Sequence, residues 1–204
     1  MIRELGRWVV EHACAQAADW YRSRPDAAPL SMSINLSPIE LLQNDLPKTV
    51  AALVRASGLD PACLSLEITE GLLEEDEDVT EILRSLKSIG VRIVLDDFGR
   101  GYSSLAYLTR LPIDALKVDR SFVAGLGTGE RGGAVSEAIV SMARALALDV
   151  IGEGVETDIQ VSELRRLGCE LAQGFYFSPP VGPEEITEML RGCPPWVADR
   201  RGGI

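Results

Sequence analysis

Short apolar runs alternate with longer segments of helical periodicity along this chain. The runs are typical of strands buried on both faces and cover residues 31–37 (SMSINLS), 64–70 (LSLEITE), 91–98 (VRIVLDDF), 115–122 (ALKVDRSF), 150–156 (VIGEGVE) and 172–178 (AQGFYFS). Apolar residues at three- and four-residue intervals predict helices over 46–56, 79–89, 134–148 and 159–167. Gly90 and Gly168 follow two of these helices, at the position where helices commonly end on glycine. The alternation predicts an α/β fold with a parallel sheet and helical crossovers.

Polar side chains stand at the end of every predicted strand. In chain order they are Asn35, then Glu67 and Glu70, Asp96 and Asp97, Lys117 and Asp119, Glu153 and Glu156, and finally Gln173. One acid at a strand end usually caps the next helix, so a single case says little. In a (β/α) barrel, however, the carboxyl ends of the strands face one another across the mouth, where such enzymes place their chemistry. The repetition therefore predicts one shared site.

The predicted site is strongly acidic, and its charges need a counterion. Lys117 offsets only one of them, and converging carboxylates repel one another in a dry pocket. The donors are all oxygen, which favours Mg²⁺ or Mn²⁺ over Zn²⁺. There are enough acids for two ions, an arrangement that suits phosphoryl displacement, with Lys117 orienting the water or neutralising phosphate charge. The same residues also fit proton abstraction next to a carboxylate, as in enolase-like barrels, so the residues alone leave both chemistries open.

The charge and the apolar runs of the chain limit the classes of molecule that it is expected to bind. The formal net charge of -11 disfavours binding to a nucleic-acid polymer. No apolar run reaches the roughly 20 residues of a membrane span, and residues 1–20 read as an amphipathic helix of mixed charge rather than a signal peptide. We expect no membrane contact and a cytoplasmic location, either alone or as the cytoplasmic part of a larger membrane-anchored protein. We also expect one domain over residues 1–192 and a loose tail over 193–204.

Three other features are predicted to be structural. The four cysteines lack zinc-ligand spacing and read as reduced packing residues. His12, the one histidine, lies on the first helix and far from any strand end. Residues 127–132 (GTGERG) match the dinucleotide fingerprint G-x-G-x-x-G, but the glycines do not directly follow the strand, so an exposed loop is the better interpretation.

The strand-end segments resemble one known family. SINLS, LEITE, VLDDFGRGYSSLAYLTRLPIDALKVDRSF, IGEGVET and AQGFYFSPP occur here in the order and spacing of the EAL domain, from about residue 5 to residue 190. That family comprises bacterial phosphodiesterases that hydrolyse cyclic di-GMP to linear pGpG in second-messenger signalling that regulates biofilm formation and motility. The resemblance implies a TIM-like (β/α) barrel and a two-metal cleavage by water.

The resemblance also implies a role for each strand-end residue. Asn35, Glu67 and Asp96 match direct metal ligands, Asp97 and Asp119 match residues serving the second metal, and Glu153 matches a metal-site glutamate. Lys117 matches the lysine next to the catalytic water, so Lys117 and Glu153 are the expected catalytic pair. Glu70 matches the residue that anchors the loop after DDFG. Glu156 matches a supporting acid and Gln173 matches an active-site glutamine. Arg100 departs from the usual threonine of DDFGTG, where it could meet a phosphate.

The Glu-Ala-Leu signature itself does not occur in this sequence. A barrel of this class takes about 250 residues and eight strands, whereas six strands are predicted here. We therefore expect an N-terminally truncated, incomplete barrel with open edges and impaired catalysis. The alternative is an inactive EAL module that serves as a cyclic di-GMP receptor or protein-interaction scaffold. From the family we further expect a homodimer, and upstream sensor or GGDEF domains in the same protein.

Overall fold

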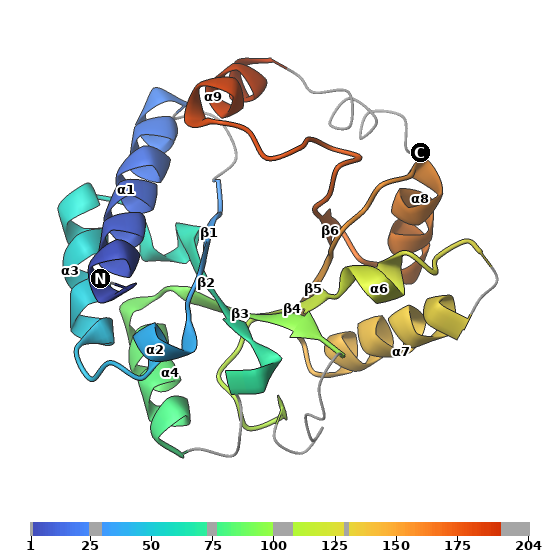
Figure 1. The fold of residues 1–204 in the computed structure, drawn as a ribbon, viewed down its shortest axis with the longest axis horizontal. Helices are drawn as coiled ribbons and strands as arrows, with labels where there is room; N and C mark the ends of the chain where they lie inside the picture. Colours follow the sequence, from blue (N-terminus) through green and yellow to red (C-terminus); the bar gives the residue numbers. More distant parts are fainter. Residues whose placement is uncertain (1, 25–29, 73–76, 100–107, 129–130, 193–204) are drawn as a thin grey trace.

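Six parallel strands form one sheet whose spatial order follows the sequence, β1-β2-β3-β4-β5-β6. The computed structural model describes residues 2–24, 30–72, 77–99, 108–128 and 131–192. The strands are β1 (Met32–Asn35), β2 (Leu64–Thr69), β3 (Arg92–Phe98), β4 (Ala115–Val118), β5 (Asp149–Gly152) and β6 (Leu171–Ala172). They curl into half of a barrel, with β1 and β6 as its outer strands (Figure 1). The predicted α/β class and the six strands are confirmed.

Helices cover the outside of the curled sheet (Figure 1). They are α1 (Ile2–Ser23), α2 (Pro38–Leu41), α3 (Leu46–Ser57), α4 (Glu77–Ile89), α6 (Arg120–Val123), α7 (Arg131–Ala145), α8 (Asp158–Leu167) and α9 (Pro183–Arg191), with short 3-10 turns η1 (Pro61–Cys63) and η2 (Glu70–Leu72). Gly90 and Gly168 follow α4 and α8 with φ of 101° and 82°, a conformation that costs glycine least. The four helices predicted from periodicity are therefore confirmed, although α7 ends at Ala145 rather than at residue 148, and both glycines lie where they were predicted.

Strands β1, β4, β5 and β6 are each at least three residues shorter than predicted, and the difference is largest for β4 and β6. β4 ends at Val118, because Asp119 caps α6 by accepting a 3.0 Å hydrogen bond from the backbone N–H of Ser121. β6 contains only two residues, because Gly174 turns the chain with φ of 155°. The Phe177 N–H then closes the turn on the Gly174 carbonyl at 3.0 Å. The predicted strand ends at 122 and 178 were wrong, and turn hydrogen bonds replace sheet pairing at both.

Strand alternation separates an outer apolar layer from an inner polar one. On β2, Leu64, Leu66 and Ile68 belong to the core under the helices, whereas Glu67 takes the opposite face. Gly152 of β5 lies against α8, where an added Cβ would be 2.5 Å from Leu164 Cδ1. Its neighbour Glu153 therefore faces inward. The apolar contacts that hold the sheet to its helices also aim the polar side chains into the half-barrel.

The first and last helices meet beside the open side of the arc (Figure 1). Trp20 of α1 donates its indole N–H to Thr187 Oγ1 of α9 at 2.9 Å. This bond joins residues 167 positions apart in the chain. The ring of helices is thus bridged where the outer strands β1 and β6 have no strand between them in the described sheet.

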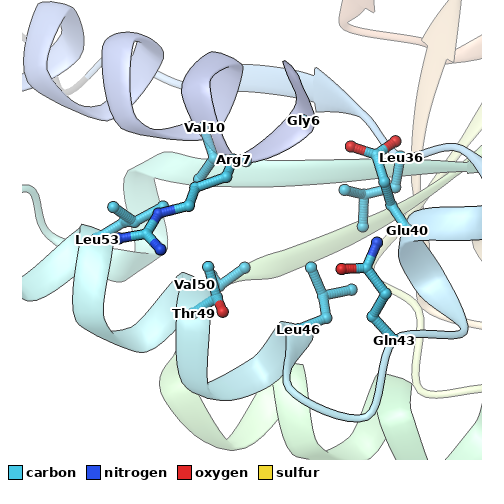
Figure 2. Close-up of a pocket in the computed structure, with 10 residues that line it drawn as sticks. All are labelled: Gly6, Arg7, Val10, Leu36, Glu40, Gln43, Leu46, Thr49, Val50 and Leu53. Atoms are coloured by element: carbon cyan, nitrogen blue, oxygen red, sulfur yellow. The ribbon is translucent and has the colours of Figure 1, made fainter. Parts of the chain in front are cut away.

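Gly6 of α1 lies against the turn that carries the end of β1 toward α2 (Figure 2). Glu40 Oε2 accepts the Ser37 N–H at 2.9 Å, which caps α2, and a Cβ on Gly6 would overlap Glu40 Oε1. Figure 2 shows the Glu40 carboxylate at one end of a small pocket and Arg7 at the other. The absence of a side chain at position 6 therefore preserves this cap.

Gly6→Ala tests that arrangement. Alanine gains about 0.5–1 kcal/mol of helix stability, but it displaces Glu40 from a cap worth about 0.5–2 kcal/mol. We expect almost no net stabilisation in the wild type, and a gain of about 0.5–1 kcal/mol when Glu40→Ala has already removed the cap. Urea unfolding of the two single variants and the double variant measures this coupling. Additive effects would show that Gly6 and Glu40 do not depend on each other.

The three described cysteines are buried: Cys14, Cys63 and Cys169. Burial raises the pKa of the Cys14 thiol to about 11. Burial also raises the pKa of Cys63 and Cys169. Because the thiolate is the reactive form, we expect iodoacetamide at pH 8 to label none of the three in the native protein and all three in denaturant. Peptide mass spectrometry reads this out, and native labelling of Cys14 would contradict its packing.

Among the described helices, none is both long enough and apolar enough to cross a bilayer.

Candidate active site

Lys117 is the centre of the strand-end site. Its ammonium Nζ lies 2.9 Å from Glu67 Oε2, 3.0 Å from Asp96 Oδ1 and 3.1 Å from Glu153 Oε1. These three acids come from β2, from β3 and from the residue after β5, so one side chain of β4 joins four neighbouring strand ends. The Lys117 side chain is only 3% exposed and that of Glu67 only 6%. The contacts therefore act in a poorly hydrated environment, where charge interactions are stronger than at a surface.

These contacts fix the charge of Lys117. Burial by itself would lower its pKa, but the hydrogen bond and charge of Glu67, followed by those of Asp96, outweigh burial and hold the pKa above its ordinary value. Lys117 is therefore a cation throughout the neutral range. It donates hydrogen bonds and cannot act as a general base there.

A β-bulge brings Asp96 and Asp97 to the same site. In a regular strand two adjacent side chains point to opposite faces. Here the pairing with β4 shifts between Leu95 and Phe98, which leaves an extra residue on β3. Asp97 has φ of 56°, a left-handed conformation that aspartate adopts more readily than most residues. Its N–H donates to Asp96 Oδ1 at 2.9 Å, so the bulge delivers two carboxylates where a straight strand delivers one.

Asp96, Asp97 and Glu153 form an acidic cluster with the spacing that a metal ion could use, among the residues that the structure describes. One carboxylate oxygen from each lies within 4.8 Å of the others. All three side chains are partly exposed, so an ion can reach them. Gln173 donates a 2.7 Å hydrogen bond to Glu153 Oε1, which fixes the orientation of that carboxylate. An oxygen-only cluster of this kind fits a hard divalent cation.

The remaining sequence-predicted residues surround this cluster. Asn35 is paired in register with Glu67, and the exposed Glu156 lines the same cavity as Glu153. Glu70 Oε2 accepts the N–H of Gly99 at 3.1 Å, so it holds the backbone that follows the two aspartates. Asp119 is 2% exposed and caps α6 through Ser121. The structure thus brings the predicted residues to one end of the sheet, while Arg100 lies outside the described residues.

A cavity of about 1000 Å³ opens between the strand ends and residues 173–186. Its inner wall carries acids, including Asp97, Asp119 and Glu153. Its outer wall is largely apolar and includes Phe175 and Ile186. Such a volume is at the upper end of small-molecule sites, which commonly combine an apolar lining with a few polar groups.

Arg120 and Phe175 are among the residues of this cavity that sequence reasoning missed. Both were placed inside predicted strands, at 115–122 and 172–178, where they carried no signal of their own. Asp119 followed by Arg-Ser is a helix-cap pattern, and the glycine before Phe175 is a turn signal, so both could have been found.

Two features judged structural from the sequence lie away from the site. The His12 Nδ1 lies 2.8 Å from the Trp8 carbonyl on α1, and its ring stacks on Trp8 with centroids 4.0 Å apart. The G-x-G-x-x-G segment begins at Gly127, after α6 rather than directly after β4. Residues 129 and 130 of that segment lie outside the described part of the chain.

The sequence of this chain is similar to those of known signalling proteins. The family model described as EAL domain matches residues 1–180. The oxygen sensor protein DosP of Escherichia coli is 41% identical over 195 residues, covering 95% of this chain and 24% of DosP. The cyclic di-GMP phosphodiesterase NbdA of Pseudomonas aeruginosa is 40% identical over 192 residues, covering 94% of this chain and 24% of NbdA. The chain spans about a quarter of the length of these relatives.

The fold of this chain is also similar to solved structures of EAL proteins. The EAL domain of Mycobacterium smegmatis DcpA superposes with a TM-score of 0.87 at 38% identity, covering 94% of this chain and 85% of that one. Klebsiella pneumoniae BlrP1, solved as a manganese and cyclic di-GMP complex, superposes with a TM-score of 0.75 at 30% identity. That match covers 87% of this chain and 44% of BlrP1, which was also solved with calcium and cyclic di-GMP. The chain belongs to the EAL domain family.

Proposed function

We propose that this chain is the catalytic part of a cyclic di-GMP phosphodiesterase, which hydrolyses one phosphodiester bond with Mg²⁺ or Mn²⁺ to give linear pGpG. The observation that carries the proposal is the strand-end site. Lys117 contacts Glu67, Asp96 and Glu153, and an oxygen-only acid cluster lies beside it. The 40% identity to a named cyclic di-GMP phosphodiesterase supports the substrate.

The donor set fits two divalent ions. Asp96, Asp97 and Glu153 have oxygens within 4.8 Å of one another, and Glu67 lies next to Asp96 through their shared contact with Lys117. Asn35 and Asp119 complete the proposed set. When bound, such ions polarise the phosphoryl oxygen and lower the pKa of water. Calcium and manganese in complexes of the related BlrP1 support this assignment.

The chain's own residues would position the reaction. Water adds to phosphorus as the bond from phosphorus to one ribose oxygen breaks, so one end becomes a phosphate and the other a hydroxyl. Lys117 stays protonated and offers positive charge to the phosphate as its negative charge develops. Gln173 positions Glu153 through its hydrogen bond. Glu70 positions the backbone at Gly99. Glu156 supports the same wall of the cavity, and Arg100 is assigned to substrate or loop support.

Turnover by these 204 residues alone is proposed to be slow. The described sheet has six strands, whereas a closed barrel has about eight. Its outer strands therefore leave backbone groups unpaired and lower stability. We propose that the protein forms a homodimer in the cytoplasm. We also propose upstream sensor or GGDEF domains, which is consistent with relatives about four times longer than this chain.

The test compares this chain with a version extended upstream by a segment that carries Glu-Ala-Leu. Both are incubated with cyclic di-GMP and Mg²⁺ or Mn²⁺, and the products are separated by chromatography. We expect linear pGpG from the longer chain and at least tenfold less from the shorter one. Equal rates would contradict the proposed impairment. If neither chain forms pGpG but cyclic di-GMP still binds, a receptor or scaffold role is favoured. If cyclic di-GMP is neither bound nor hydrolysed by either chain, the enolase-like chemistry is reopened.

A further inference from the structure

The ring of Phe175 is the most exposed large apolar side chain of the described residues. It is 68% exposed although it lies on the wall of the cavity that also holds Asp97 and Glu153. Exposed apolar surface of this size is unfavourable in water, and a large contiguous patch of it typically marks a binding surface. The acids of the opposite wall cannot cover it, because they need water or cations.

The backbone that carries Phe175 is held rigidly against the acid site. The Val155 N–H donates to the Gln173 carbonyl at 3.0 Å, and the Tyr176 N–H donates back to the Val155 carbonyl at 2.9 Å. Gly174 allows this approach, since a Cβ there would overlap the backbone of Val155. The Gln173 side chain is bonded to Glu153 in the same segment. The backbone at Phe175 is therefore anchored, two residues after the glutamine that bonds to the acidic cluster.

The neighbouring aromatic rings are already engaged. Phe177 packs against the core, and its ring meets that of Tyr176 edge to face with centroids 5.3 Å apart. Tyr176 does not line the cavity. Phe177 also lines the cavity but is partly buried against the core, so Phe175 is the most exposed aromatic ring that this segment offers to a bound molecule, within the part of the chain that the structure describes.

We propose that Phe175 is a stacking platform for one guanine base of the cyclic dinucleotide. The ligand has two kinds of surface, anionic phosphates and flat aromatic bases, and the cavity has two matching walls. With a phosphate at the acid cluster, we expect one base to lie in the same cavity against the apolar part of its lining, where the ring of Phe175 would cover one face of the base. This inference rests on the proposed substrate. It assigns a specificity-determining role to a residue outside the metal site.

The test is calorimetric titration of cyclic di-GMP into the full chain with Ca²⁺, using Phe175→Ala, Phe175→Leu and Phe175→Trp. Base stacking on an aromatic ring predicts about five- to hundredfold weaker binding for alanine. Leucine, which keeps apolar bulk without a ring, should behave nearly like alanine, and tryptophan should bind within about twofold of the wild type. Ca²⁺ binding alone should be unchanged in all three. Because the ring is exposed, thermal melting should show the variants to be folded.

Tyr176→Ala is the matched control, because it removes a neighbouring aromatic ring that does not line the cavity. It should bind cyclic di-GMP like the wild type. A Phe175→Ala variant that binds within twofold of the wild type, or a Tyr176→Ala variant that loses as much affinity, overturns the stacking role and leaves the proposed function intact. A wild type that binds no cyclic di-GMP contradicts the proposed function, and this inference with it.

Discussion

Replacing Lys117 by methionine is expected to lower turnover strongly and to destabilise the metal-free protein by about 3–5 kcal/mol. Methionine keeps most of the length of the side chain but removes the ammonium that holds Glu67, Asp96 and Glu153 together. Three carboxylates then face one another around a buried position without a cation. We expect turnover to fall at least a hundredfold, in the range reported for loss of one preorganised stabilising group.

Divalent metal should restore part of that stability. An added cation reduces the repulsion among the same carboxylates, so Mn²⁺ should raise the melting temperature more in Lys117→Met than in the wild type. The raised pKa of Lys117 means that its stabilisation is complete below the ordinary lysine value, about 10.4, and is lost only as pH rises through the higher folded-state pKa. The melting temperatures of Lys117→Met and the wild type can therefore be compared at any pH near neutrality.

Lys87 provides the matched control. It pairs with Asp114 at 2.6 Å, but the two side chains are 32% and 24% exposed and lie away from the acid cluster. Lys87→Met should cost about 1 kcal/mol or less and leave turnover unchanged. Urea unfolding in EDTA and in Mn²⁺ measures both variants. If Lys117→Met proved as stable as Lys87→Met, with normal turnover, the central role of Lys117 would be wrong.

Asp97→Asn is the second change with a large expected effect, and it separates charge from backbone geometry. Asparagine adopts the φ of 56° found at this position as readily as aspartate does, so the bulge should persist and stability should change by about 0.5 kcal/mol or less. Loss of one negative charge from the cluster should weaken Mn²⁺ binding by about tenfold or more and turnover by about a hundredfold or more.

Two further substitutions complete that experiment. Asp97→Ala should lose metal binding and also about 1–2 kcal/mol of stability, because alanine is strained in the left-handed region. Asp97→Gly should lose metal binding without that strain. Metal titration and urea unfolding of the three variants give the comparison. An Asp97→Asn variant with unchanged Mn²⁺ affinity would remove Asp97 from the metal site.

The sequence predicted which side chains gather at the strand ends, because each apolar run stops at a charged or amide residue, although the exact bounds of several strands were wrong. Lys117 and Asp119 were placed on one face by simple alternation, and both are buried at the predicted end of the sheet. The same rule fails for Asp96 and Asp97, which alternation would send to opposite faces. Only the bulge explains their convergence, and a bulge depends on pairing with β4, which no local pattern reveals.

The partners of Lys117 were also beyond the sequence. Four strand ends must be arranged in space before three acids can be seen to share one ammonium. Phe175 was hidden for a different reason. Assigned to a strand over 172–178, it was one aromatic residue among three, whereas the turn at Gly174 exposes its ring to the cavity. The positions of both side chains thus depend on tertiary hydrogen bonds, which local sequence propensity does not reveal.

The most direct test of the central claim is titration of cyclic di-GMP into this chain with Ca²⁺ and again in EDTA. The account predicts saturable binding that requires the divalent ion and that is lost in Asp97→Asn. Binding of equal strength in EDTA, or no binding under either condition, would contradict a metal-dependent cyclic di-GMP site at these strand ends.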